Sequence, residues 1–512
     1  MKSRSAKEGT ANRRNFLPIA LSLNLSSKPK CMSKYINLER ILWLVALCFI
    51  ASFATIRVIG LAPDAALYAG LANKVFMTGE YWLLRGTDGF FPKFYEHPPY
   101  FFQWGSWLMG MFGASDMTAK LMGAIPTFIA LLILATFTFK NWGWKLAAWT
   151  IFIVATTGHY TKYAATSLLE APLALFTLMA LISTYYFHKA EKNYWRLLAM
   201  LGLFLSVAGA CASKGVVGLG CVGGALLSYA LIILVKNRSL FEFVRLWFLG
   251  VFLVFAAALP FLLWLLKSFQ SPELASWVLG YFEEQVLRSA TTNRGEEFFH
   301  EADNYFYYLG VLARNLWPWI WTVPVGVWFA LKTRSDITIP KGFRLYMLVA
   351  FSFFIAFLVP LSLVSYKLPH YMHPTYLLLA PVGGWGMLVL FDKLIQRFPV
   401  VSEASIPFRW LFLFAAFYLT LGQGARLSST QNRGQEFYEL GLKTNELNSA
   451  CTIWIPESQT APYRMEAFSL WYLGGRAWKR IENDYPSRIT IPKDVIYWDP
   501  SKSILWNGED CI

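Results

Sequence analysis

Long apolar stretches alternate with short polar ones through most of this chain. A helix needs about 20 apolar residues to cross the hydrocarbon core of a bilayer, and stretches of that order recur from residue 41 to residue 423. We count about eleven of them, and the pattern predicts an α-helical polytopic membrane protein. They lie near residues 41–60, 119–139, 144–158, 169–187, 196–212, 216–235, 246–266, 305–331, 345–364, 372–391 and 408–423.

The two ends of the chain differ from this apolar region. The N-terminal end is basic and polar, whereas residues 424–512 are polar with short periodic runs. Strand-like runs at 452–455 and 495–498 lie on either side of a helix-like run at 463–472, which predicts a small α/β domain. The expected domains are a leader at 1–40, a membrane domain at 41–423 and a C-terminal domain at 424–512.

The charge of the chain bears on how it lies in the membrane. Its formal net charge is +15, but 56% of its residues are hydrophobic and 17% are aromatic. The basic residues gather in the leader and in every second loop, which is typical of cytoplasmic loops rather than of a nucleic-acid-binding face. We therefore expect membrane lipid as a partner, a cytoplasmic N-terminus and a periplasmic C-terminus. The basic loop residues are Lys140, Lys145, Lys189, Lys192, Arg196, Lys236, Arg238, Arg245, Lys332, Arg334, Lys341, Arg344, Lys393, Arg397 and Arg409.

Five ionisable residues fall together on the opposite, outer side. Two of them lie in or before a long outer loop at about 61–118, and three lie at the outer ends of later helices. Such residues are costly at a membrane unless they face a cavity, so their clustering indicates a functional site on the non-cytoplasmic face. They are Asp64, Glu96, Glu170, Lys214 and Lys367.

Carboxylates beside cations suit the transfer of a sugar from a lipid phosphate. A carboxylate accepts the proton of an acceptor hydroxyl, while a cation or metal stabilises the negative charge that develops on the departing phosphate. Arg288, in a second outer loop, is a further candidate phosphate contact. Other interpretations are a helix-end cap for Asp64, solvated loop charges for Glu96 and Arg288, and lipid-facing anchors for Lys214 and Lys367.

Several short motifs resemble the GT-C class of polytopic glycosyltransferases. Within that class the chain is similar to the lipid A aminoarabinose transferases and to the bacterial relatives of protein O-mannosyltransferases, over about residues 41–423. The motifs are Asp64 with Tyr68-Ala69, Tyr95-Glu96-His97-Pro98-Pro99 with Trp104, Glu170, Ser213-Lys214-Gly215, Trp317-Pro318-Trp319, and Lys367-Leu368-Pro369-His370-Tyr371 with Pro374.

The resemblance implies a role for each of these residues. It implies a GT-C fold, a polyprenyl-phosphate sugar donor, and inverting transfer on the periplasmic face of the bacterial inner membrane. Asp64 would be the catalytic carboxylate and Glu170 the second acidic position, whereas Lys214 and Lys367 would contact the donor phosphate. Glu96, together with His97, would bind a divalent metal or order the loop. At the family's metal-binding histidine this chain has Gln285.

More than one function is compatible with this pattern. The resemblance implies that the acceptor would be lipid A or another envelope molecule, or a peptide if the chain is a protein O-mannosyltransferase-like enzyme. A transporter or flippase is the alternative of another class, but the sequence lacks the repeated halves and midplane charges typical of transporters. A third alternative is an assembly protein that uses its tail for docking.

The cysteines make one further prediction. None of the six lies in a C-x-x-C motif, which argues against zinc and thioredoxin-like sites. Cys451 and Cys511 are the only two in the tail, which the charge pattern places in the oxidising periplasm. We therefore predict a disulfide between them.

Overall fold

The structure is a computed structural model of the whole chain. It describes residues 30–58, 60–87, 93–236, 240–287, 304–332, 339–364, 367–397, 413–418, 421–422, 432–444, 451–456, 462–474, 478–481, 492–499, 504–507 and 509–511. The chain forms two compact units, Met1–Trp43 and Leu44–Ile512. Helix α1 (Lys30–Phe53) begins in the first unit and ends in the second.

Long apolar helices dominate the second unit, as the sequence predicts. Within the described ranges, six helical stretches are long and apolar enough to cross a membrane, and two apolar helices are shorter. The number eleven stays a prediction. The helices of this membrane region are α4 (Asp116–Trp142), α5 (Trp144–Ala155), α7 (Glu170–Lys189), α8 (Asn193–Lys214), α9 (Leu219–Lys236), α10 (Leu240–Ser268), α14 (Thr322–Leu331), α15 (Phe343–Leu363) and α16 (His373–Arg397).

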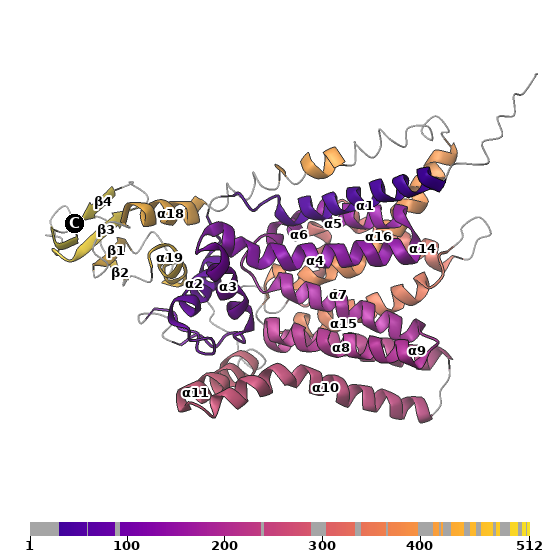
Figure 1. Cartoon of the computed structure of the whole chain (residues 1–512), viewed down its shortest axis with the longest axis horizontal. Coiled ribbons are helices and arrows are strands. Elements are labelled where there is room, and N and C mark those ends of the chain that lie inside the picture. The colour runs from indigo at the N-terminus through magenta and orange to yellow at the C-terminus, as the bar shows by residue number, and fades with distance from the viewer. Residues whose placement is uncertain are drawn as a thin grey trace, which may run out of the picture. The chain divides into compact units, whose positions relative to one another are not determined.

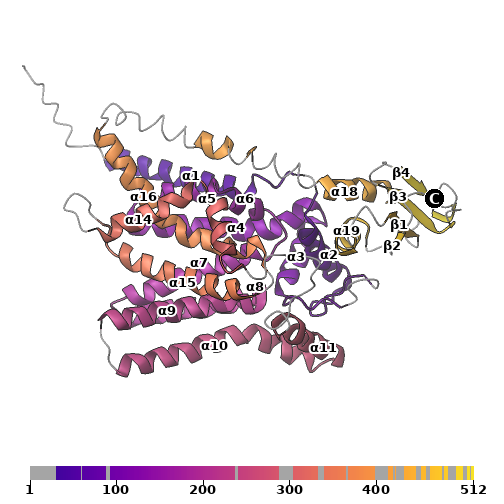
Figure 2. The same ribbon diagram turned by 180° about the vertical axis from the view of Figure 1, so that it is seen from behind.

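The helices pack side by side with their long axes nearly aligned. Helix α7 contacts α8, and α10 contacts both α8 and α9, as Figures 1 and 2 show from opposite sides. The two ends of this bundle therefore correspond to the two surfaces of a membrane. Short elements join the helices: α6 (Gly158–Ala164), η1 (Gly215–Gly218), α11 (Pro272–Gly280), the π-helical turn η2 (Tyr281–Leu287) and η4 (Pro369–Met372).

Two expected segments are different in the structure. The predicted span at 305–331 is divided into α13 (Tyr307–Asn315), η3 (Trp319–Trp321) and α14, because Pro318 has no N–H to donate within a helix. The outer segment expected as a loop at 61–118 contains two helices, α2 (Pro63–Thr78) and α3 (Tyr100–Phe112). Both are too short to be recognised as membrane spans.

The tail forms the small α/β fold that its sequence predicts. Its sheet has the order β2-β1-β3-β4, with β1 parallel to β2 and β3, and β4 antiparallel to β3. Two of its strands and one helix had no counterpart in the sequence pattern. Its elements are α18 (Asn432–Thr444), β1 (Thr452–Pro456), α19 (Pro462–Tyr472), β2 (Trp478–Ile481), β3 (Val495–Asp499), β4 (Ile504–Asn507) and η7 (Glu509–Cys511).

Helix α19 holds the tail against the outer segment of the membrane region. Apolar residues of α2, α3 and the tail share one core, in which the Leu470 side chain packs at Gly70. Two carboxylates accept hydrogen bonds across the contact between the tail and the membrane region. Asp116 accepts a hydrogen bond of 2.8 Å from Trp471 Nε1, and the fully buried Glu466 accepts one of 2.8 Å from the backbone N–H of Thr87. The tail thereby supports α2, the helix that carries Asp64.

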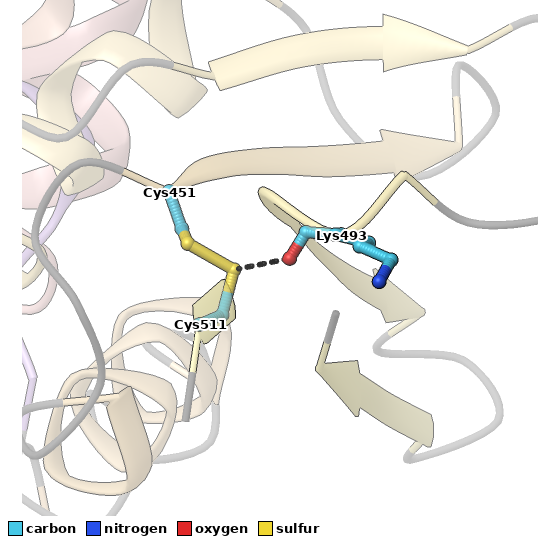
Figure 3. The surroundings of a disulfide bond; sticks show 3 residues. All are labelled: Cys451, Lys493 and Cys511. Atoms are coloured by element: carbon cyan, nitrogen blue, oxygen red, sulfur yellow. Dashed lines mark hydrogen bonds between the residues drawn. A yellow bond between two sulfur atoms is a disulfide. The ribbon is translucent and has the colours of Figure 1, made fainter. Parts of the chain in front are cut away.

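Cys451 and Cys511 form the disulfide that is predicted from the sequence. Their Cα atoms lie 5.9 Å apart, and the bond joins residues 60 positions apart in sequence. Figure 3 shows the Cys511 Sγ atom beside the carbonyl oxygen of Lys493, at 3.5 Å. Both cysteines are buried. The bond connects η7 to the residue just before β1.

Removing this disulfide is expected to destabilise the tail. Closing a loop of this length restricts the unfolded chain by about 2–4 kcal/mol, so Cys451→Ala/Cys511→Ala should lower the free energy of unfolding of the tail by that amount. The measurement is thermal or denaturant unfolding of the purified protein in detergent. Reductant should destabilise the wild type and leave the double variant unchanged; equal stability of the two proteins without reductant would contradict the prediction.

Candidate functional site

A buried ion pair joins two of the predicted site residues. Lys214 is the last residue of α8, Glu170 is the first of α7, and the Lys214 Nζ atom contacts Glu170 Oε1. The two side chains are only 4% and 2% exposed. A buried charge is expensive unless it is paired, so each of these residues accounts for the burial of the other.

A close-packed turn fixes the position of Lys214. Gly215 ends α8 with φ +59°, where a side chain is strained, and an added Cβ would lie 1.8 Å from the Tyr281 hydroxyl. That hydroxyl accepts a hydrogen bond of 3.0 Å from the backbone N–H of Val216. The segment containing Tyr281 therefore braces the turn that presents Lys214, and only glycine fits at its centre.

The turn η4 adds a histidine and a tyrosine to the same pair. His370 Nε2 lies 3.4 Å from Glu170 Oε1, and the Lys214 Nζ atom lies 4.1 Å from the centre of the Tyr371 ring. An aromatic face stabilises a cation at this distance. Glu170 is thus in contact with a lysine and a histidine that come from two different elements.

Asp64 lies in the first turn of α2, close to the segment that precedes Glu170. Pro63 occupies the start of this helix, where its missing N–H costs nothing. The Ser167 hydroxyl donates a hydrogen bond of 2.6 Å to the carbonyl of Ala65. This bond joins the start of α2, which carries Asp64, to the turn that leads into Glu170. The two segments are about 100 residues apart in the sequence.

Tyr68 contacts His97 and is affected by the charges of the predicted acidic residues. It is one turn after Asp64 on α2, and its hydroxyl is 2.9 Å from His97 Nε2. Burial raises the pKa of Tyr68 well above its ordinary value, and neighbouring negative charges raise it further. These charges are the carboxylates of Asp64, Glu96 and Glu170. The three predicted acidic residues therefore act electrostatically on the same tyrosine.

Two predicted phosphate contacts remain, Lys367 and Arg288. Lys367 is almost fully buried, at 1% exposed, and lies two residues before the start of η4. A lysine this deeply buried is unusual on a surface that only faces lipid headgroups. Arg288 lies outside the described residues, so its predicted phosphate contact stays a prediction.

The predicted metal ligands Glu96 and His97 are neighbours in the segment before α3. In the part of the chain that the structure describes, no three His, Cys, Asp or Glu side chains are grouped so that they could hold a metal ion. His97 contacts the Tyr68 hydroxyl, and Glu96 is the one candidate ligand beside it in sequence. The divalent metal that the resemblance implies therefore stays a prediction, with Glu96 and His97 as the residues that would hold it.

Three residues near the predicted site were assigned no role from the sequence. Tyr68, His370 and Tyr371 stand within the motifs, but tyrosine and histidine at a membrane surface are more often part of an interfacial belt. Their distance in sequence from the predicted site residues is the feature that could have indicated a role. Tyr68 is four residues after Asp64 and so lies on the same helix face, and His370 is three residues after Lys367.

One curated protein resembles this chain in sequence. No family model matches the sequence. A curated relative, undecaprenyl phosphate-alpha-4-amino-4-deoxy-L-arabinose arabinosyl transferase 2 of Proteus mirabilis, is 23% identical over 325 residues. The match covers 61% of this chain and 52% of that protein, so the chain spans about half the length of the relative.

Solved structures match over most of the chain. ArnT from Cupriavidus metallidurans bound to undecaprenyl phosphate superposes with a TM-score of 0.63 and 18% identity, over 88% of this chain and 87% of that one. Its apo state gives 0.64 and 17% identity, over 89% and 87%. The archaeal oligosaccharyltransferase AglB from Archaeoglobus fulgidus, solved with an inhibitory peptide and a dolichol-phosphate, gives 0.54 and 13% identity, over 87% and 64%. The chain is therefore a multi-pass membrane protein with the GT-C fold that ArnT and AglB share.

Proposed function

We propose that this chain is a glycosyltransferase of the bacterial inner membrane that uses a polyprenyl-phosphate sugar as donor. The acceptor would be lipid A or another envelope molecule on the periplasmic face, with the N-terminus of the chain in the cytoplasm and its C-terminus in the periplasm. The buried cluster of Glu170, Lys214 and His370 at one end of the bundle carries this proposal. The fold it shares with ArnT, whose structure contains undecaprenyl phosphate, supports the class of donor.

Asp64 and the buried cluster would have different roles in the reaction. Asp64 is partly exposed and stands at the start of α2, which suits a group that exchanges a proton with an incoming acceptor. The Glu170 carboxylate is buried and already contacts Lys214 and His370. We therefore assign proton transfer to Asp64 and assign Glu170 to positioning the lysine.

The proposed reaction is one displacement at the sugar's anomeric carbon. The acceptor hydroxyl oxygen forms the new glycosidic bond while the bond from that carbon to the phosphate oxygen breaks. The hydroxyl proton moves to the Asp64 carboxylate. The phosphate leaves with the bonding electron pair, and Lys214 and Lys367 stabilise the negative charge that it gains.

Sugar transfer by the purified protein tests this proposal. A transferase needs no sealed membrane, so the protein in detergent should move sugar from undecaprenyl-phosphate aminoarabinose, or from another polyprenyl-phosphate sugar, to lipid A. A transporter or flippase would show no transfer under these conditions. Mass spectrometry of lipid A and of envelope glycoproteins, from cells with and without the protein, would then distinguish a lipid acceptor from the peptide acceptor of a protein O-mannosyltransferase-like enzyme.

Lys367→Ala is expected to weaken use of the donor strongly. The lysine is buried beside η4, and losing a charge-assisted contact to phosphate should raise the apparent KM for the donor about tenfold or more. The matched control is Lys140→Ala, which removes an exposed lysine from the last turn of α4 and should leave KM unchanged. An unchanged donor KM in a folded Lys367→Ala protein would remove this lysine from the donor site.

A further inference from the structure

A second polar site lies at the other end of the bundle from Glu170. Helix α7 begins at Glu170 and ends at Lys189, so its two ends are separated by about 28 Å along the helix axis. At the far end, α7, α8, α9 and α10 surround a cavity of about 780 Å³. This volume lies within the range of small-molecule sites in proteins.

Two arginines stand at the cavity where helices begin. Arg196 is in the first turns of α8, and its Nε donates a hydrogen bond of 2.9 Å to the carbonyl of Ala190. Arg245 is in the first turns of α10, and its Nη1 donates a bond of 2.7 Å to Glu242. A guanidinium has five N–H donors, so each arginine is anchored by one of these bonds and keeps others for a ligand.

Glu242 orders this cationic end of the cavity. Its second carboxylate oxygen accepts a hydrogen bond of 2.6 Å from the Tyr229 hydroxyl of α9. The carboxylate therefore connects α9 to Arg245 of α10 and holds the guanidinium in place. Two arginines against one glutamate leave one net positive charge among these three residues, so the polar end of the cavity favours an anion.

The deeper part of the cavity is apolar. Met200 is four residues beyond Arg196 on α8, and Phe252 is seven beyond Arg245 on α10. At 1.5 Å per residue they lie about 6 Å and about 10 Å further into the bundle. Ile233, three residues before the end of α9, adds an apolar side chain nearer the polar part of the cavity. Cations at the surface with apolar walls below them match a molecule that has an anionic head and a hydrocarbon chain.

We infer that this cavity binds an anionic phospholipid, whose phosphate contacts Arg196 and Arg245 and whose acyl chain lies between α8 and α10. The basic residues at this end of the bundle are those that indicate a cytoplasmic surface, and anionic lipids concentrate in such a leaflet. The site is separate from the donor site proposed above, and its test does not depend on sugar transfer.

Lipid binding to the full-length protein tests this inference. Native mass spectrometry in detergent, with added phosphatidylglycerol or phosphatidylcholine, gives the occupancy and affinity of each lipid. The wild type should bind phosphatidylglycerol about tenfold more tightly than phosphatidylcholine, and Arg196→Gln/Arg245→Gln should abolish this preference. The matched control Lys145→Gln removes an exposed lysine from the start of α5, in an ion pair with Asp392, and should keep the preference.

A second variant tests the apolar part of the site without changing its charge. Met200→Trp should fill the space for the acyl chain and lower phosphatidylglycerol affinity about tenfold, while the arginines remain. Inorganic phosphate alone should give no comparable stabilisation of the wild type against thermal unfolding. Wild-type lipid preference in the double arginine variant, or phosphate acting as well as phosphatidylglycerol, would overturn the inference.

Discussion

Asp64→Asn is expected to lower turnover by on the order of 10²-fold or more, the scale typical of removing a positioned general base. Asparagine keeps the shape of the side chain but has no basic carboxylate to accept the acceptor's proton. The helix should still form, because Pro63 and the buried residues of α2 are unchanged. Donor binding should also persist, since the proposed phosphate contacts are lysines on other elements.

The measurement is turnover and donor binding on the same purified, monodisperse variant. Asp116→Asn is an informative comparison, because that carboxylate accepts hydrogen bonds from α19 and acts through structure. We expect Asp116→Asn to lower thermal stability more than Asp64→Asn does. Near-normal turnover in Asp64→Asn would exclude it as the base and leave Glu170 as the next candidate.

The sequence predicts the membrane region well because its signal is one of length and composition. A bilayer selects long apolar helices irrespective of their packing partners, so α4, α7, α8 and α15 stand where the apolar stretches do. Glu170 and Lys214 also meet at one end of the bundle, where charges gather because the chain leaves the hydrocarbon core. The length and apolar character of a membrane helix are properties of one segment, so they can be predicted from the sequence of that segment alone.

The rest depends on contacts between distant segments. Helix α2 is apolar because it packs against α19, hundreds of residues later, so its composition alone gives no boundary. The pairing of Glu170 with Lys214 is likewise invisible before folding, because 44 positions separate them. The sequence therefore names both residues but assigns them independent roles, whereas the structure makes each the partner of the other.

The Glu170–Lys214 pair leads to the second large expected effect. Glu170→Gln leaves the Lys214 ammonium buried without its counter-charge, and breaking a buried ion pair in this way costs about 3–5 kcal/mol. Replacing both members by Glu170→Gln/Lys214→Met removes the uncompensated charge and should recover most of that stability. The measurement is the free energy of unfolding in mixed micelles. A suitable control is Glu273→Gln, which breaks the exposed 2.8 Å pair with Arg85 and should cost at most about 1 kcal/mol.

Activity separates a structural role of this pair from a functional one. If Lys214 contacts the donor phosphate, the double variant should be nearly as stable as the wild type yet remain defective in donor use, because methionine has no charge to offer. If the pair served stability alone, sugar transfer would return together with stability. A double variant that is both stable and fully active would therefore remove Lys214 from the donor site, whereas a Glu170→Gln protein as stable as the wild type would show that the two charges do not compensate each other.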